Sequence, residues 1–303
     1  MKTLLIPLSC SGLLAGGLLA SDGATHSHQD GFEVTSTPVA GKVHVLNGRG
    51  GNIGASIGDD GVLLIDDQFV QSEPHIRAAI EALGKTEVTF LVNTHWHGDH
   101  TGSNAGFGEE ATIIAHENVR RRLAGDPSIE GRKNENSAPP AALPVVTHED
   151  GLSLYFNGER VRLLTFGHGH TDGDTVVWFT GSNVVHMGDL YFDVGYPFVD
   201  LSSGGGVQGL IRSLKAVLET VPADVKVISG HGRVTDTAEL KEYLAMIETV
   251  TERVREAQAL GETPEQMVAN GITADLDERW GGFDFVTPIR FVTAVHESLS
   301  QDR

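Results

Sequence analysis

The chain contains 303 residues, of which 40% are hydrophobic, and its 22 Lys and Arg residues face 41 Asp and Glu residues, giving a formal net charge of −19 at pH 7. This length and composition allow a full hydrophobic core in one large domain or two small ones. The excess negative charge argues against nucleic acids and anionic membrane surfaces as partners.

Residues 1–20 are predicted to form a secretory signal peptide. The run over residues 4–19 is mostly apolar, but it is too short and too rich in Gly and Ser for a membrane span. Cleavage is expected near Ala20, and an uncleaved anchor is the alternative. The processed protein would be periplasmic or secreted, without stable membrane insertion. It would contain no disulfide and no thiolate metal ligand, because Cys10 is the only cysteine.

The remaining chain is predicted to be a flexible leader, residues 21–31, followed by one domain, residues 32–303. Short β-rich runs predict strands over residues 32–36, 42–46, 53–57, 62–65, 88–93 and 112–115. Gly61 follows two aspartates between the third and fourth of these strands, which is a hairpin signal. An antiparallel meander therefore opens the domain. Helices are predicted between residues 72 and 84 and over residues 117–123.

A long loop is predicted over residues 125–144, which contain four prolines and scattered charges. A loop of this length is often functional, so it either covers a site or is a mobile surface excursion.

The second half repeats the order of strands, helix and strand. Strands are predicted over residues 152–156, 160–166, 175–179, 183–186 and 225–229, and helices over residues 207–220 and 237–260. A tail follows, with a capped helix from Thr263, a loop around Trp280 and a last helix over residues 288–299. Helices flanking a central pair of sheets would bury all these apolar faces, and packing against the sheets is the expected role of the tail.

The strand over residues 88–93 leads directly into H-W-H-G-D-H at residues 95–100. Three imidazoles and a carboxylate in six residues are costly to gather unless a metal ion holds them. His95 and His97 point the same way in extended backbone. Gly98 gives the chain freedom in φ to turn, so that Asp99 and His100 can face a second point. One segment can thus supply ligands to two neighbouring metal ions.

Three later stretches offer the missing ligands at strand ends or in Gly-rich turns. They contain His170, Asp189 and His231, within residues 167–174, 186–190 and 229–232. In this order the motifs resemble those of the metallo-β-lactamase superfamily, which are H-x-H-x-D-H, a later histidine, an aspartate and a final histidine. The resemblance implies an α/β fold, the four-layer αββα sandwich of the metallo-β-lactamase type.

The resemblance also implies the ligand set. One zinc ion would be held by His95, His97 and His170, and a second by Asp99, His100 and His231, with Asp189 bridging the two. Imidazole and carboxylate ligands suit zinc independently of the resemblance. Asp66, which closes the strand over residues 62–65, resembles the early aspartate of the family that orients a metal-bound histidine; a simple turn residue is the alternative.

Such a site predicts an exported zinc-dependent metallo-hydrolase. A hydroxide bridging two zinc ions, oriented by Asp99 and Asp189 as catalytic residues, would attack a small ester, lactone, thioester or β-lactam. Dedicated β-lactamases of the superfamily usually lack a bridging aspartate, whereas thioesterase, lactonase and RNA-processing branches have one. The negative charge and the predicted export disfavour RNA as the substrate.

Two other functions remain open. The superfamily includes iron-dependent sulfur dioxygenases, so an oxidoreductase is one alternative. His97 stands where the flavo-diiron branch usually has a glutamate, which argues against that branch. A periplasmic metal-binding accessory protein with little turnover is the other alternative.

Several further residues have two interpretations. Tyr191 and Tyr196 are candidates for the tyrosine that lactonase-like members have after the bridging aspartate, or they are buried aromatics. The free N–H groups of residues 202–206, which lead into a helix, could bind a substrate carboxylate, or the segment is only a cap. His168 is expected to lie outside the ligand set, as are the histidines that match no motif.

Overall fold

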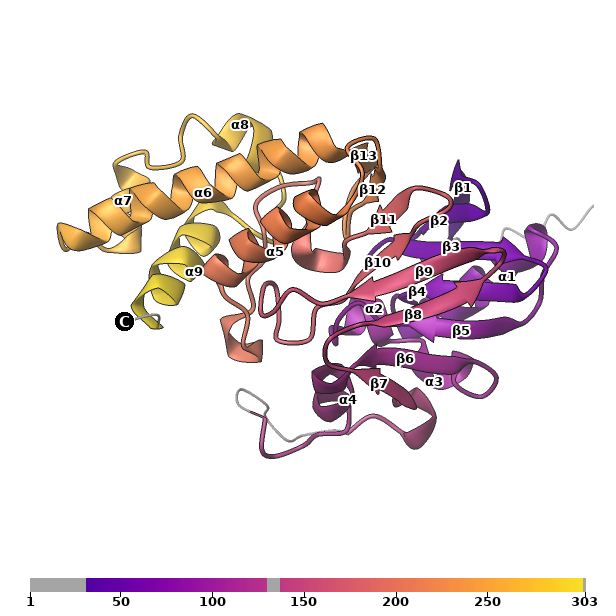
Figure 1. Cartoon of the computed structure of the whole chain (residues 1–303). Helices are drawn as coiled ribbons and strands as arrows, with labels where there is room; N and C mark the ends of the chain where they lie inside the picture. The colour runs from indigo at the N-terminus through magenta and orange to yellow at the C-terminus, as the bar shows by residue number, and fades with distance from the viewer. Residues whose placement is uncertain (1–30, 130–136, 302–303) are drawn as a thin grey trace, which may run out of the picture. The chain divides into compact units, whose positions relative to one another are not determined.

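The computed structural model describes residues 31–129 and 137–301 (Figure 1). The predicted signal peptide and the leader up to residue 30 lie outside the described residues. Residues 130–136, in the middle of the predicted loop over residues 125–144, also lie outside the described residues. Within the described ranges, no helix has both the length and the apolar character needed to cross a membrane.

The first sheet has seven strands that lie side by side in chain order. They are β1 (Thr35–Ala40), β2 (Val43–Asn47), β3 (Ile53–Gly58), β4 (Gly61–Ile65), β5 (Val88–Val92), β6 (Thr112–His116) and β7 (Val146–His148). Strands β1 to β4 pair antiparallel, and β4 to β7 pair in parallel. The predicted meander is confirmed, and its hairpin turns at Gly61, which has a φ of +116°.

The second sheet has six strands, in the order β13-β12-β11-β10-β9-β8. They are β8 (Leu152–Phe156), β9 (Glu159–Leu164), β10 (Val176–Phe179), β11 (Val184–His186), β12 (Lys226–Ile228) and β13 (Val234–Asp236). Only the β11–β12 pair is parallel within this sheet. The parallel pair matters because it brings the carboxyl ends of two strands to the same edge.

Helices cover the outer face of each sheet (Figure 1). The first half of the chain contributes α1 (Glu73–Ala82), α2 (Gly98–Thr101), α3 (Asn104–Phe107) and α4 (Glu117–Leu123). The second half contributes α5 (Val207–Thr220), α6 (Thr237–Ala259), α7 (Pro264–Ala269), α8 (Asp277–Trp280) and α9 (Pro288–Gln301). Short 3₁₀ turns are η1 (Val70–Ser72), η2 (Pro140–Ala142), η3 (Gly188–Leu190) and η4 (Leu201–Ser203).

The alternation of side chains along β4 explains the layers. Val62 and Leu64 pack outward in a cluster with residues of α1, whereas Leu63 and Ile65 pack between the two sheets. Successive side chains of a strand point to opposite faces of the sheet. A strand that lies between helices and a second sheet therefore needs apolar residues on both faces. A third cluster joins the second sheet to α5, α6 and α9. The predicted four-layer αββα sandwich is confirmed.

The main differences from the predicted elements lie at short edge strands. The first strand begins at Thr35 rather than at residue 32, and it continues through Pro38 to Ala40. Pro38 has no N–H group, but β1 is at the edge of the sheet, where proline is tolerated, and the register shifts beside it. Strands β7 and β13 were not predicted because each is a three-residue edge strand, V-T-H or V-T-D, with a single apolar residue.

Buried histidines at the ends of β6 and β7 make stability depend on pH. The ring centroids of His116 and His148 are 5.8 Å apart. Burial and, secondly, the proximity of His116 lower the pKa of His148 from 6.5 to about 4. The unfolded chain therefore takes up a proton first, so the contribution of His148 to stability is complete above pH 6.5 and is lost between pH 6.5 and about 4.

We expect the free energy of unfolding of the wild type, relative to that of His148→Gln, to fall by about 2 kcal/mol between pH 8 and pH 5. Urea denaturation of both proteins across this range measures the difference. A difference that is independent of pH would contradict the lowered pKa.

Candidate metal centre

Strands from both sheets carry the predicted ligands to one place. β5 leads through Thr94 into His95, β11 leads into Asp189, and β12 leads into His231. His170 comes from the loop before β10, and the backbone of the loop is tied to the first sheet where Thr175 N donates to Thr94 O over 2.7 Å. The carboxyl ends of strands are where α/β sheets place ligands.

A first group of side chains consists of His95, His97 and His170. His97 Nδ1 lies 3.1 Å from His95 Nε2 and 2.9 Å from His170 Nε2. Asp189 Oδ2 completes this group, at 3.5 Å from His170 Nε2 and 3.8 Å from His95 Nε2. These four side chains come from three separate segments between residues 95 and 189 and could together hold a metal ion.

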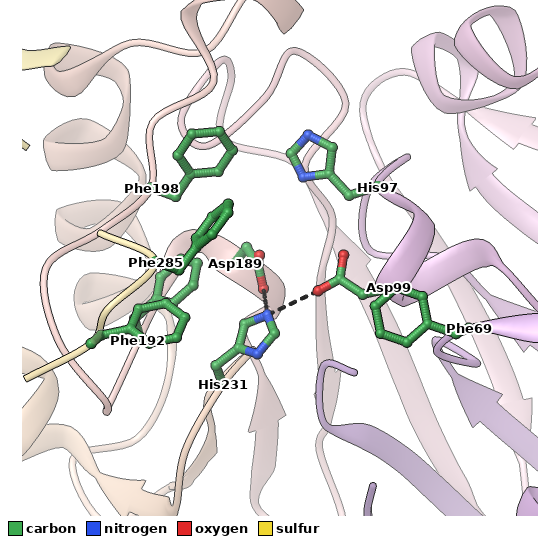
Figure 2. A pocket seen from close by; sticks show the side chains of 9 residues that line it. Phe69, His97, Asp99, Asp189, Phe192, Phe198, His231 and Phe285 are labelled. Atoms are coloured by element: carbon green, nitrogen blue, oxygen red, sulfur yellow. Dashed lines mark ion pairs between the residues drawn. The ribbon is translucent and has the colours of Figure 1, made fainter. Parts of the chain in front are cut away.

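A second group consists of Asp99, His100 and His231. His231 Nε2 lies 3.3 Å from Asp99 Oδ2, and both face the cavity shown in Figure 2. Asp189 Oδ1 lies 3.2 Å from His100 Nε2 and 3.6 Å from His231 Nε2. The two oxygens of Asp189 therefore face different groups, which is the arrangement that a bridging ligand requires.

The hydrogen bonds around the first group leave nitrogen lone pairs facing each other. His97 Nε2 donates to Asp200 Oδ2 over 2.9 Å, and His170 Nδ1 donates to Phe198 O over 2.7 Å; these partners assign the tautomers. In neutral rings the remaining nitrogens are acceptors, and they lie 2.9 Å apart. Two such lone pairs at this distance repel each other unless a cation, either a proton or a metal ion, lies between them.

The second group shows the same need. His100 Nε2 and Asp189 Oδ1 are buried and have no hydrogen-bond partner among the described residues. Ligand atoms around a tetrahedral ion with bonds of about 2.0–2.1 Å are separated by about 3.3 Å. The distances from Asp189 to the surrounding imidazole nitrogens, 3.2–3.8 Å, are close to this value. The donor set and its spacing fit metal ions.

The electrostatics favour the metal-binding protonation states at His95, His170 and Asp189. Burial lowers the pKa of His95 well below its usual value and that of His170 to about 4, so both rings are neutral donors of a lone pair. Burial would raise the pKa of Asp189, but His100, His231 and His95 outweigh it and hold this pKa well below the usual range. Asp189 is therefore ionised. At His100 and His231 burial would lower the pKa, but Asp189 outweighs it and raises the pKa of His100 well above its usual value and that of His231 to about 9, so both rings release a proton when they bind a metal ion.

The turn between the two halves of H-W-H-G-D-H differs from the prediction. We expected the chain to turn at Gly98 through the freedom of glycine in φ. This prediction is wrong, because Gly98 does not adopt a positive φ. Instead, His97 is the N-cap of α2, and His100 N donates to His97 O over 3.0 Å. One helical turn is enough to carry Asp99 and His100 to the second group.

Asp66 lies where a positioning role requires it. Its Oδ2 accepts a hydrogen bond from His100 Nδ1 over 2.8 Å, and its carboxylate also accepts from Thr94 N and Thr94 Oγ1, each over 2.7 Å. Asp66 is fully buried and has a φ of +66°. The carboxylate thus fixes the ring of one candidate ligand and the backbone directly before another, His95.

Asp200 makes a similar contact that the sequence did not reveal. Its Oδ2 accepts from His97 Nε2, while Oδ1 accepts from Ser202 Oγ and Ser203 N. Burial would raise the pKa of Asp200, but the hydrogen bond from His97 and those from the two serines hold it far below the usual range. The only local signal is that of an N-cap before η4, which says nothing about His97.

Replacing Asp200 by asparagine is expected to weaken metal binding about 10- to 100-fold, because His97 loses the charged acceptor that orients it. Competition against a coloured zinc chelator measures the affinity. Ser202→Ala removes a hydrogen bond from the other oxygen of the same carboxylate and is the matched control, with wild-type affinity expected. Equal affinities in all three proteins would contradict a positioning role for Asp200.

Other candidates lie away from both groups. His168 is exposed, as expected for a residue outside the ligand set. Tyr191 and Tyr196 are fully buried in the core on the helical side of the second sheet, and Tyr196 Oη donates to Asp277 over 2.8 Å. Neither tyrosine lines the cavity beside the cluster, so both are buried aromatics.

Of the two interpretations of residues 202–206, the anion site is wrong and the segment only leads into α5. The N–H groups of Ser203, Gly204 and Gly205 donate to carbonyls of η4 and its N-cap residue. Gly206 N donates to Gly169 O over 2.8 Å, and Val207 N donates to Ser298 Oγ over 3.0 Å. The segment looks open in the sequence because glycines carry no side chains, but the tertiary fold occupies these donors.

A cavity of about 390 Å³ opens beside the cluster (Figure 2). Four cluster residues line it, namely His97, Asp99, Asp189 and His231, together with five phenylalanines, Phe69, Phe192, Phe198, Phe283 and Phe285. We call these five the phenylalanine wall. Phe283 and Phe285 come from the tail between α8 and α9, to which the sequence assigned only packing.

The chain is similar to known and probable hydrolases. The chain is 32% identical over 181 residues to the Probable metallo-hydrolase YqgX of Bacillus subtilis, covering 57% of this chain and 84% of that protein. It is 30% identical over 160 residues to a hydroxyacylglutathione hydrolase of Rhodospirillum rubrum, covering 53% of this chain and 54%, about half, of that protein.

A solved structure shows the same fold. A metallo-beta-lactamase from Pontibacter korlensis superposes with a TM-score of 0.61 at 18% identity, covering 71% of this chain and 99% of that chain. The family model of the metallo-beta-lactamase superfamily matches residues 46–232, a range that includes every residue of both ligand groups. The chain therefore belongs to the metallo-β-lactamase superfamily.

Proposed function

We propose that the protein is an exported dinuclear zinc hydrolase that opens or cleaves a small carbonyl substrate. The observation that carries this proposal is the position of Asp189, whose Oδ1 faces one group of candidate ligands and whose Oδ2 faces the other. Nitrogen and oxygen donors without a thiolate suit zinc. When bound, two zinc ions would supply a nucleophilic hydroxide near neutral pH and a Lewis acid for the carbonyl oxygen.

The residues of the chain would perform the positioning. Asp66 accepts a hydrogen bond from His100, Asp200 accepts one from His97, and the carbonyl of Phe198 accepts one from His170. These bonds fix the tautomer of each ring, so that its other nitrogen keeps a lone pair directed inward.

The two carboxylates at the cavity would orient the attacking group. Asp99 directs Oδ2 at His231, which leaves its Oδ1 to accept a hydrogen bond from the water that attacks the substrate. Asp189 fixes the spacing of the two groups. The phenylalanine wall lowers the polarity around the site, which strengthens electrostatic interactions in it.

The substrate is an ester, lactone, thioester or β-lactam. The hydroxyacylglutathione hydrolases among the relatives support acyl hydrolysis, and no serine or cysteine nucleophile is needed for it. Export rests on the apolar run that ends at Ala20.

Metal analysis and a substrate panel test the proposal. We expect about two zinc ions per chain, and turnover of at least one member of a panel of lactones, esters, thioesters and β-lactams. Turnover should be lost in Asp99→Ala and His170→Ala and retained in Asp224→Ala, which removes an exposed carboxylate. One iron ion per chain would favour the oxidoreductase instead, and two zinc ions without turnover of any panel member would favour an accessory protein.

A further inference from the structure

The cavity beside the metal cluster divides into a polar floor and an apolar wall. Among the described residues that line it, every one outside the two ligand groups is a phenylalanine. Figure 2 shows Phe192, Phe198 and Phe285 on one side of the cavity and Phe69 on the other side, with His97 and Asp99. A substrate whose reacting carbonyl reaches the floor must therefore place its remaining atoms against phenyl rings.

The rings closest to the cluster are held in place by its imidazoles. Phe192 stacks on His231 with centroids 5.2 Å apart and planes at 10°. Phe198 lies 5.9 Å from the ring of His97, and its backbone carbonyl accepts the hydrogen bond from His170. The same residue thus orients a candidate ligand and forms the wall, so the wall is rigid where it meets the floor.

The outer part of the wall comes from the tail. Trp280, at the end of α8, is buried, and its carbonyl accepts a hydrogen bond from Tyr196 N over 2.9 Å. Phe285 contacts the guanidinium of Arg290, which lies 4.6 Å from the ring centroid. The family model ends at residue 232, so this part of the wall belongs to a segment outside the matched range.

The wall offers no charge to a substrate. No lysine or arginine lines the cavity among the described residues. Arg290 faces the ring and carbonyl of Phe285, and Arg233 is paired with Asp193 at 2.8 Å and with Glu239 at 2.9 Å. Arg290 is exposed and lies outside the lining of the cavity. An anionic group held inside the cavity against the phenyl rings would lose its water without gaining a cationic partner there, which is costly.

The rim of the cavity extends the apolar surface. Phe285, which lines the cavity, is 50% exposed. Large apolar side chains exposed beside a cavity are typical of a binding groove.

We infer that the enzyme selects uncharged lactones or esters that carry an apolar arm, aliphatic or aromatic, and discriminates against substrates whose arm carries a carboxylate. This inference rests on the proposed hydrolase function and names the substrate class of that site. The carbonyl occupies the floor, and the arm lies along Phe192, Phe198 and Phe285.

A series of lactones with unbranched side chains of increasing length tests the inference. We expect kcat/KM to rise about fourfold for each added methylene until the cavity is filled, because each buried CH₂ contributes apolar transfer energy. A lactone of equal length whose side chain ends in a carboxylate should be a much poorer substrate than its uncharged counterpart. A flat series, or equal rates for the charged and uncharged members, would overturn the inference.

Two variants connect the series to the wall. Phe285→Ala truncates a half-exposed ring and should flatten the dependence on chain length. Tyr155→Ala, which removes an aromatic ring that is 80% exposed on β8, should keep the wild-type slope. Hydrolysis that depends on Asp99 but shows the same slope in Phe285→Ala as in the wild type contradicts only the substrate class. Absence of Asp99-dependent hydrolysis contradicts the proposed function itself.

Discussion

Asp189→Asn is expected to lower kcat/KM on the order of 10³-fold, corresponding to the several kcal/mol that a two-metal site contributes to transition-state stabilisation. Asp189 is the one cluster residue whose two oxygens face both ligand groups, at 3.2–3.8 Å from four imidazole nitrogens. Asparagine keeps the shape of the side chain but presents one oxygen and one N–H₂ group, so one group loses its ligand and gains a donor that repels a cation.

Kinetics and metal content are measured on the same preparation of the Asp189 variant. We expect the zinc content to fall from about two ions towards one per chain. Asp224→Asn makes the same chemical change at an exposed position that binds Asn183, and it should retain both zinc ions and activity. Wild-type kcat/KM in Asp189→Asn would show that the carboxylate does not bridge.

Asp66→Ala is expected to destabilise the fold by about 3–5 kcal/mol, because it removes one partner of a buried pair. The N–H and hydroxyl of Thr94 and the ring of His100 all donate to this carboxylate, and none of them reaches water. Alanine also has to adopt the φ of +66° at this position, which costs about 1 kcal/mol more. Denaturant unfolding measures the loss.

Asp66→Asn separates the loss of the hydrogen bonds from the cost of the positive φ. Asparagine tolerates a left-handed backbone and can still accept from Thr94, so it should destabilise the protein less than alanine does. Both variants should bind zinc about 10- to 100-fold more weakly, since His100 loses its carboxylate. A change of less than about 1 kcal/mol in Asp66→Ala would contradict the burial and the hydrogen bonds that we describe.

The ligand groups could be predicted because each ligand lies in a short sequence motif. In H-W-H-G-D-H, the residue types indicate metal binding, and the apolar run before them predicts that they lie at the end of a strand. His170, Asp189 and His231 likewise follow short motifs at ends of strands or in turns. The layers of the fold were predictable for a similar reason, since strands such as β4 are apolar on both faces.

The residues that surround the ligands could not be predicted in this way. The hydrogen bond between Asp200 and His97 joins residues 103 positions apart, and no spacing within either segment implies it. Phe283 and Phe285 are two aromatics in a loop without a period, so only the packing of Trp280 and Tyr196 brings them to the cavity. Tertiary contacts, rather than local sequence patterns, decide which side chains line the cavity and position the ligands.

The most direct test of the two-metal site is a crystal structure of the zinc-loaded protein with anomalous data collected on both sides of the zinc edge. We predict two zinc peaks per chain, about 3.5–4 Å apart, one on each side of the Asp189 carboxylate. A single peak held by His95, His97 and His170 alone, or a signal that belongs to iron, would contradict a dinuclear zinc hydrolase.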